Sequence, residues 1–143
     1  MLSPGRGREI ASATAPQAAS PAGEPAGANI VDKTDEEIFV LARPLWRDLV
    51  KSSNEGKYGE FVRHFSASFA LAMDQVAAGH QFANSELARS LSEDYEALGI
   101  IRRGQHATVL FRQRSTKKPG EWLGRLVLGY EDGKVRIFGA TLF

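Results

Sequence analysis

The spacing of apolar residues in this chain changes once, at Gly99, and this change constrains the fold more than any other feature. Before Gly99 the apolar residues recur mostly at three- and four-residue steps, which is typical of amphipathic helices. After Gly99 the period falls to two, which is typical of strands. Helices followed by consecutive strands predict an α+β fold, in which N-terminal helices pack on an antiparallel sheet of three to four strands.

Residues 1–33 differ in composition from the rest of the chain. Ala, Pro, Gly and Ser supply 19 of these 33 positions, and no aromatic residue occurs among them. Such a segment buries too little apolar surface to offset the entropy lost on ordering. We therefore predict a disordered leader over 1–33 and one domain over 34–143. The leader lacks the continuous apolar stretch of a secretory signal, so we expect a cytoplasmic protein, with a transit peptide or tether as the alternative.

The first helix of the domain has a clear start and an internal proline. Thr34 and Glu37 have the spacing of a capping box, in which each side chain binds the backbone N–H of the other residue. The apolar stripe behind them continues to about Ser52. Pro44 lies inside this stripe and predicts that the helix kinks or resets near residues 40–44, because proline lacks the N–H that an interior helical residue donates.

Three further helices are expected before the strands. The first two cover 58–64 and 67–78. The third follows residue 85 and ends at Gly99, because four apolar residues recur there at steps of four, four and three. These residues are Leu87, Leu91, Tyr95 and Leu98.

Strands are expected over 100–103, 106–114, 121–130 and 135–143, with a tight hairpin at 131–134. The final strand has apolar residues on both faces. One face holds Val135, Ile137 and Phe143, and the other holds Phe138, Ala140 and Leu142. Since helices can cover only one face, we expect a homodimer that forms through the sheet.

The order of the expected elements resembles that of the nuclear transport factor two-like superfamily, with its cystatin-like cone. The resemblance is carried by the helix over 35–51, the segment EGKYGEFVRHF at 55–65 and the strands over 121–143. The resemblance covers 34–143. It implies a strongly bent, cone-shaped sheet and a pocket between the helices and the concave face of the sheet, commonly in a dimer. The aromatic candidates for this pocket are Trp46, Tyr58, Phe61, Phe65, Tyr95 and Trp122.

The superfamily contains isomerases, dehydratases and cyclases as well as non-catalytic binding modules, so the fold does not decide the function. Its ketosteroid-isomerase-like members place an Asp base in the pocket, often beside a Tyr or acid that donates a hydrogen bond. The titratable side chains considered for such a role are Asp74, Asp94, Tyr95, Glu96, His64 and His106. No position matches a catalytic motif of the family residue by residue, so we assign no catalytic residue.

Metal and cofactor sites are not expected. The chain has no Cys, and its three histidines, of which His80 stands in a loop, do not have the i,i+4 spacing of a zinc helix. The glycines form no phosphate-binding loop between a strand and a following helix. No apolar stretch is long enough to span a membrane.

Charge is distributed unevenly along the chain. Residues 34–98 contain 6 basic and 11 acidic side chains, a net charge of −5, whereas residues 99–143 contain 9 basic and 3 acidic ones, a net charge of +6. A basic face would attract a carboxylate or phosphate ligand or an acidic partner, and the alternative is a solvated sheet edge. Nucleic acid is not expected, because the net charge is only +1. The candidate residues of this face are Arg112, Arg114, Arg125 and Arg136.

These patterns favour a non-catalytic dimeric module. We expect it to bind a small apolar or amphipathic ligand in the cone, or a protein partner on the sheet. The alternative is a small isomerase, dehydratase or cyclase with an acid–base residue in the pocket. An inward-facing titratable side chain with a shifted pKa would favour the enzyme, and a purely apolar pocket would favour the binding module.

Overall fold

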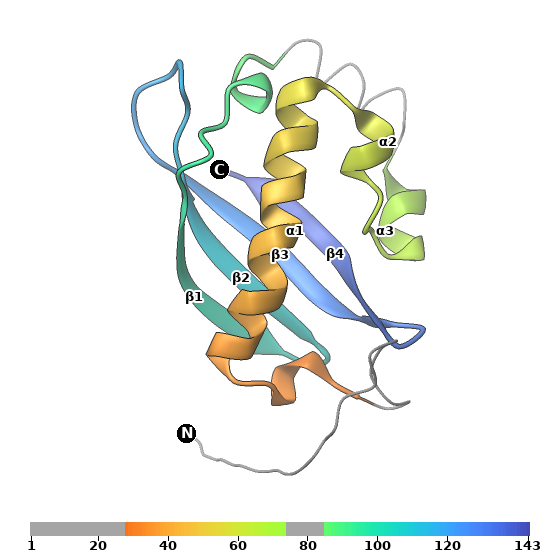
Figure 1. Cartoon of the computed structure of the whole chain (residues 1–143). Coiled ribbons are helices and arrows are strands. Elements are labelled where there is room, and N and C mark those ends of the chain that lie inside the picture. Colours follow the sequence, from red (N-terminus) through yellow and green to blue (C-terminus); the bar gives the residue numbers. More distant parts are fainter. Residues whose placement is uncertain (1–27, 74–84) are drawn as a thin grey trace.

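The computed structural model describes residues 28–73 and 85–143. In these residues four strands form one antiparallel sheet in the order β1-β2-β3-β4, and the helices lie on one face of it, as Figure 1 shows. The predicted α+β fold is confirmed. The elements are η1 (Ile30–Asp32), α1 (Asp35–Glu55), α2 (Tyr58–Phe61), α3 (Ala67–Ala72), η2 (Leu87–Arg89), β1 (Glu96–Arg103), β2 (His106–Gln113), β3 (Trp122–Glu131) and β4 (Lys134–Leu142).

The domain begins before the predicted boundary at residue 33. Ile30, in η1, is fully buried in the core. The guanidinium of Arg102 in β1 donates hydrogen bonds to two backbone carbonyls of this segment. Residues 28–33 therefore belong to the domain rather than to the leader. Most of the predicted leader, together with Asp74 and His80, lies outside the described residues.

The capping box that starts α1 is confirmed. Thr34 Oγ1 accepts from the Glu37 N–H at 3.2 Å, and a Glu37 carboxylate oxygen accepts from the Thr34 N–H at 2.9 Å. The helix then runs without interruption through Pro44 to Glu55, so the predicted reset near the proline is wrong. Pro44 and Val40 both lie on the exposed side of α1, where water can reach the carbonyl that proline leaves without a partner. Gly56 ends the helix with a φ of 68°, the left-handed conformation that glycine adopts easily.

The helix predicted over 58–64 is shorter than expected because the residues after it pair with the sheet. The N–H of Ile137 donates to the carbonyl of His64 at 2.7 Å, and the N–H of Ser66 donates to the carbonyl of Ile137 at 2.8 Å. These bonds place Phe65 alongside β4 as a parallel bridge. The chain then enters α3, which the hydroxyl of Ser66 caps by accepting from the Phe69 N–H.

The helix predicted to follow residue 85 is wrong. Only Leu87–Arg89 form a 3-10 turn, and from Glu96 the chain is a strand that pairs with β2. Leu98, one of the four apolar residues whose spacing predicted this helix, is 48% exposed. The spacing of four, four and three is compatible with a helix. The segment instead pairs with distant parts of the chain, including a β-bridge between Leu91 and Ser115.

A register shift explains why the final strand carries apolar residues at both odd and even positions. Val127 pairs with Gly139, whereas the next residue, Leu128, pairs with Ile137. Phe138 is therefore an extra residue, and the alternation of side chains reverses at this point. Ile137, Ala140 and Leu142, predicted on opposite faces, consequently all face the helices. The apolar residues at odd and even positions of the final strand, from which we predicted the homodimer, are thus explained by the register shift and do not require a second copy of the chain.

The turn between β3 and β4 forms as predicted, with positive φ values at Asp132 (54°) and Gly133 (75°), the residues such a hairpin prefers. The sheet in Figure 1 is twisted but not strongly curled, so the strong bend and the cone shape are not confirmed. Among the described helices, none has the length and hydrophobicity needed to cross a bilayer.

The hydrophobic core lies between α1 and the face of the sheet that α1 covers. Residues of α1 at three- and four-residue steps pack against alternating residues of the central strands, which is the complementarity expected for a helix on a sheet. The buried residues of α1 include Ile38, Ala42, Trp46 and Leu49, and those of the strands include Val109, Phe111, Leu126, Leu128 and Ile137.

Candidate functional site

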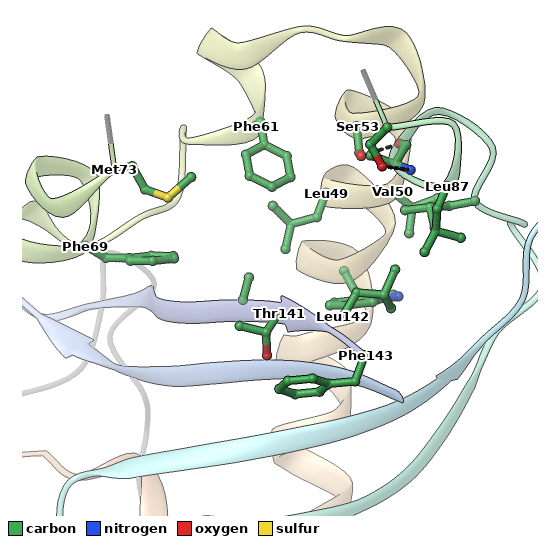
Figure 2. A pocket seen from close by; sticks show the side chains of 15 residues that line it. Leu49, Val50, Ser53, Phe61, Phe69, Met73, Leu87, Thr141, Leu142 and Phe143 are labelled. Atoms are coloured by element: carbon green, nitrogen blue, oxygen red, sulfur yellow. Dashed lines mark hydrogen bonds between the residues drawn. The ribbon is translucent and has the colours of Figure 1, made fainter. Parts of the chain in front are cut away.

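A cavity of about 470 Å³ lies between the C-terminal half of α1 and the end of β4. Residues of α1, α2, α3, the segment 85–91 and the end of β4 form its walls (Figure 2). Of the fifteen residues that line it, twelve are apolar and the other three are Ser53, Ser85 and Thr141. The side chains of Thr141 and Phe143 point to the opposite face of β4, so Ser53 and Ser85 supply the hydroxyl groups of the cavity (Figure 2). The cavity therefore offers an apolar surface with a few neutral hydrogen-bonding groups.

Trp46 of α1 forms a rigid part of the cavity wall. Its indole is stacked on Phe111 with ring centroids 4.9 Å apart, and its N–H donates to the Gln113 side chain at 2.9 Å. Gly124 of β3 leaves room for the indole, because a Cβ at that position would lie 2.5 Å from Trp46 Cζ2. The ring is therefore held by stacking and by a buried hydrogen bond, in a space that the missing side chain of Gly124 leaves open.

The segment 85–91 forms a second wall, which polar contacts hold against α1. The side-chain amide of Asn54 donates to the Leu91 carbonyl at 2.9 Å and accepts from the Leu91 N–H at 2.8 Å. The guanidinium of Arg89 also donates to the Asn54 carbonyl at 3.1 Å. These contacts bring the apolar side chains of Leu87 and Leu91 to the cavity.

Two hydroxyl groups of the cavity meet at the backbone of Ala88. Ser53 donates to the Ala88 carbonyl, and Ser85 accepts from the Ala88 N–H at 3.0 Å. Ser53 Oγ therefore keeps lone pairs that can accept, while the Ser85 hydroxyl keeps a proton that it can donate. Together they could hold the polar end of an amphipathic ligand.

The structure brings only two of the six predicted aromatic residues to the cavity, Trp46 and Phe61. Phe65 is instead buried between Phe61 and Phe69, with ring centroids 5.5 and 4.3 Å away. Tyr95 packs edge-on against Phe111, the ring on which Trp46 stacks, with ring centroids 5.8 Å apart.

Tyr58 at the start of α2 and Trp122 at the start of β3 are half-buried and line no part of the cavity. The lining residues that the sequence analysis missed as ligand contacts include Leu49, Phe69, Met73, Leu87 and Leu142. Leu49 belongs to the apolar stripe of α1, so the sequence indicates its burial. Nothing in the sequence indicates that a cavity borders it.

The titratable candidates do not meet in the cavity, whose lining includes no titratable side chain of a described residue. Asp94 and Glu96 are exposed. His106 packs against Phe138 on the opposite face of the sheet. Tyr95 is half-buried, and this burial raises the pKa of its hydroxyl, which keeps it protonated. No described group of acidic or histidine side chains has the arrangement of a metal site.

His64 lies near α1 rather than in the cavity. Its Nε2 is 3.9 Å from a carboxylate oxygen of Asp48, to which Arg63 also forms an ion pair at 3.4 Å. Burial, followed by the nearby charge of Arg63, lowers the pKa of His64, and Asp48 offsets only part of this effect. The neutral imidazole is therefore favoured in the folded protein.

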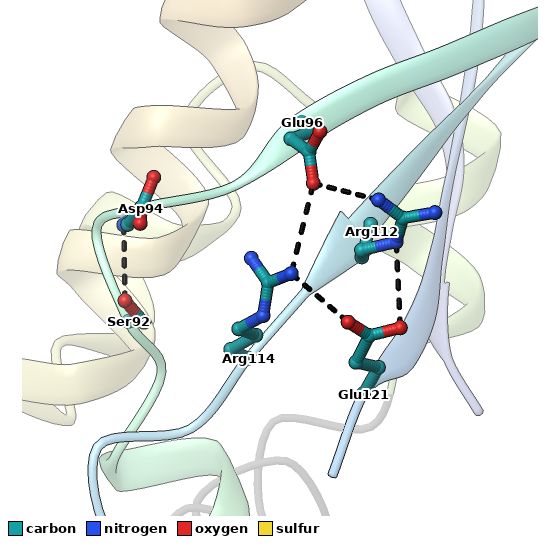
Figure 3. A network of polar contacts seen from close by, with 6 residues as sticks. All are labelled: Ser92, Asp94, Glu96, Arg112, Arg114 and Glu121. Atoms are coloured by element: carbon teal, nitrogen blue, oxygen red, sulfur yellow. Dashed lines mark hydrogen bonds and ion pairs between the residues drawn. The ribbon is translucent and has the colours of Figure 1, made fainter.

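The predicted basic face divides into two parts. Arg112 forms ion pairs with Glu96 (2.8 Å) and Glu121 (3.4 Å), and Arg114 forms ion pairs with the same two carboxylates at 3.8 and 2.9 Å, as Figure 3 shows. These two arginines are therefore neutralised by their neighbours. Arg125 lies over the Phe143 ring at 5.4 Å, and neither it nor Arg136 has an ion-pair partner among the described residues.

In comparisons with known proteins, no protein-family model, no curated protein and no solved structure matches this chain.

Proposed function

We propose that this chain is a non-catalytic binding module whose cavity takes a small apolar or amphipathic molecule. One observation carries the proposal: twelve of the fifteen residues that line a cavity of about 470 Å³ are apolar, and the other three are Ser or Thr. Pockets that hold drug-sized molecules have volumes of about 300–1,000 Å³, and most of their lining is apolar. The cavity therefore has the size and surface that a ligand of this class requires.

The lining also suggests how such a ligand would be oriented. An apolar body would pack against Trp46, Leu49 and Phe61, since burying apolar surface is worth roughly 25 cal/mol per Å². A hydroxyl or carbonyl end would lie at Ser53 and Ser85, which supply an acceptor and a donor. Neutral ligands are favoured, because none of the described residues that line the cavity is a cation that could offset the desolvation of an anion.

The alternative, an isomerase, dehydratase or cyclase, has less support. General acid–base chemistry needs a titratable group within hydrogen-bond reach of the substrate. The candidates among the described residues, such as His64, Asp94 and His106, all lie away from the cavity lining. Serine or threonine hydroxyls without a neighbouring base are weak nucleophiles at neutral pH.

The resemblance to the nuclear transport factor two-like superfamily is likewise a proposal. It is supported by the order of the described elements, in which α1, α2 and α3 precede a four-stranded antiparallel meander. The homodimer through the sheet stays a prediction, and no described helix occupies the face of the sheet that such a dimer would use.

The test is a titration of the purified protein with N-phenyl-1-naphthylamine, a neutral apolar fluorophore, together with native mass spectrometry for any ligand retained from the source. We expect saturable binding that the Ala140→Phe substitution weakens at least tenfold, because the phenyl ring would occupy the cavity. Ala72→Phe is the matched control, since Ala72 is exposed on α3 and lines no part of the cavity.

A second filling variant, Met73→Trp, guards against a folding defect in Ala140→Phe. Met73 lines the α3 side of the cavity and is only half-buried, so a larger side chain there perturbs the core less. Equal affinity in the native chain and in both folded filling variants would overturn the proposal. So would a native protein that does not bind the fluorophore and retains no small molecule.

A further inference from the structure

The face of the sheet turned away from α1, here called the outer face, displays a band of exposed apolar side chains. Six large apolar residues among those described are exposed, and the strand register places three of them on this face: Ile101 (51%), Leu123 (38%) and Phe143 (63%). A fourth, Leu98 (48%), stands at the register shift of β1, beside Gly99 of the same face. Leu110 and Val127 lie between them on the central strands and are half-buried. Exposed apolar side chains gathered on one face commonly mark an interaction site.

Positive charges without partners border this band on one side. Arg103 pairs with His106 across β1 and β2, and Arg136 pairs with Gly129 across β3 and β4. His106 and Gly129 are neighbours, since a Cβ on the glycine would lie 2.8 Å from the imidazole. Arg103, His106 and Arg136 thus form one row across the sheet, and Arg125 stands inside the apolar band.

The outer face carries a clear excess of positive charge. Arg103, Arg125 and Arg136 have no ion-pair partner among the described residues, whereas Arg112 and Arg114 share two carboxylates. Five arginines against two glutamates give this face a net charge of +3, and the charges of Lys134 and Glu131, which pair across the β3–β4 hairpin, cancel each other. Glu131, at the end of β3, does not reduce the excess there, because its carboxylate accepts from the Ala67 N–H of α3.

This charge decides between the possible occupants. A second copy that packed through its own outer face would bring a face of charge +3 against another of charge +3, which costs electrostatic energy. Residues 1–27 carry two arginines and two glutamates, so they have no net charge with which to complement the face. A phosphate polymer would leave the apolar band uncovered. A partner with both carboxylates and apolar side chains complements both features.

The dimensions of the face favour a helix. Strands of eight residues, such as β1 and β2, are about 26 Å long, and an 18-residue helix has nearly the same length, about 27 Å. The other face of the same sheet already accommodates a helix, α1, of 21 residues. We propose that the outer face docks an amphipathic helix of a partner protein, with apolar side chains on the band and carboxylates against Arg103, Arg125 and Arg136.

The probe for this proposal is a synthetic 18-residue helical peptide with a leucine stripe flanked by glutamates, compared with the same peptide carrying lysines. We expect the glutamate peptide to bind the full chain and to shift the amide resonances of β1–β4 on the outer face. Its affinity should fall at least tenfold in the double variant Arg125→Glu/Arg136→Glu. It should also fall between 50 and 300 mM salt, because exposed charge pairs are screened.

Two exposed lysines away from the outer face provide the matched control. Lys51→Glu/Lys117→Glu makes the same change in net charge on α1 and on the loop after β2, so it should leave the affinity within about twofold. Ala140→Phe should also leave it unchanged, which separates this site from the cavity. Should that cavity variant abolish peptide binding, the proposal is wrong although the cavity function stands.

Other results would also overturn the proposal. Equal binding of the lysine peptide would show that charge does not select the partner. A dimer in sedimentation analysis that Ile101→Glu dissociates would assign the face to a second copy. Binding to phosphatidylglycerol vesicles without binding to the glutamate peptide would assign it to a membrane surface.

Discussion

The indole N–H of Trp46 donates to the side-chain oxygen of Gln113 at 2.9 Å, in a buried position between α1 and the end of β2. Gln113 is fully buried, and its amide nitrogen donates to the carbonyls of Ser92 and Arg114 at 2.7 and 2.9 Å. One glutamine side chain therefore connects α1, the segment before β1 and the end of β2. Because buried polar groups are costly without partners, all of these contacts depend on each other.

Gln113→Leu is expected to lower the free energy of unfolding by about 2–4 kcal/mol. The substitution keeps a similar volume but leaves the Trp46 indole N–H and the Ser92 carbonyl without the Gln113 amide, and each such loss costs roughly 1–3 kcal/mol. The Arg114 carbonyl still accepts from the Ser92 N–H at 2.8 Å. Urea denaturation measures the change. Gln105→Leu is the control, because Gln105 is exposed in the turn between β1 and β2 and should change stability by about 0.5 kcal/mol or less. Similar effects of the two substitutions would contradict the role of the buried amide.

Gly124→Ala is expected to destabilise the fold through a steric conflict with Trp46. The added Cβ would lie 2.5 Å from the indole, which the stacking on Phe111 prevents from moving away. Such overpacking costs typically about 1–3 kcal/mol. Gly99→Ala is the matched control, since no atom lies within 4 Å of a Cβ at that strand position. Thermal unfolding should separate the two variants, and the penalty should shrink when Trp46 is replaced by Leu; a penalty that persists there would rule out this conflict as its cause.

The features that could be predicted from the sequence are those that neighbouring residues determine. The capping box of Thr34 and Glu37 and the hairpin turn at Asp132 and Gly133 each need only a few consecutive residues, and both form as expected. The change of period near Gly99 correctly places the helices before the strands, because hydrophobic alternation reflects which face of an element is buried. The boundary itself is misplaced, since β1 begins at Glu96 and the residues just before it are not helical. The α+β class follows from these local patterns.

The predictions that were wrong concern features that depend on contacts between residues far apart in the sequence. Leu87, Leu91 and Tyr95 have helical spacing, yet the following strand begins where Glu96 meets Arg112, a pairing that no local pattern reveals. The shift at Val127 similarly reverses the faces of β4. Aromatic residues were predicted at the cavity because they are bulky and apolar. Those properties predict burial but not which buried residues border an open space.

Acidification is expected to weaken the fold through His64. Burial and Arg63 lower the pKa of this histidine in the folded protein, whereas in the unfolded chain it has its ordinary value of about 6.5. As the pH falls below about 6.5, the unfolded state binds the proton more readily, so the free energy of unfolding decreases. Above that pH the contribution is constant. Denaturation between pH 5 and 7.5 should show an unfolding free energy that rises with pH, and His64→Gln should reduce this slope. An unchanged slope in that variant would exclude His64 as its source.

The wall formed by the segment 85–91 should detach when Asn54 is replaced by Asp. The carboxylate can still accept from the Leu91 N–H but cannot donate to the Leu91 carbonyl, and it places a negative charge against that oxygen. We expect a loss of about 1–3 kcal/mol in unfolding free energy and faster hydrogen exchange at the Leu91 amide, together with weaker binding of an apolar ligand. Asn29→Asp is the control, because the Asn29 side chain mainly accepts from the Val31 N–H, a role that Asp retains. Unchanged exchange at Leu91 in a folded Asn54→Asp variant would show that other contacts hold this wall, whereas fast exchange without loss of ligand binding would show that the wall does not shape the cavity.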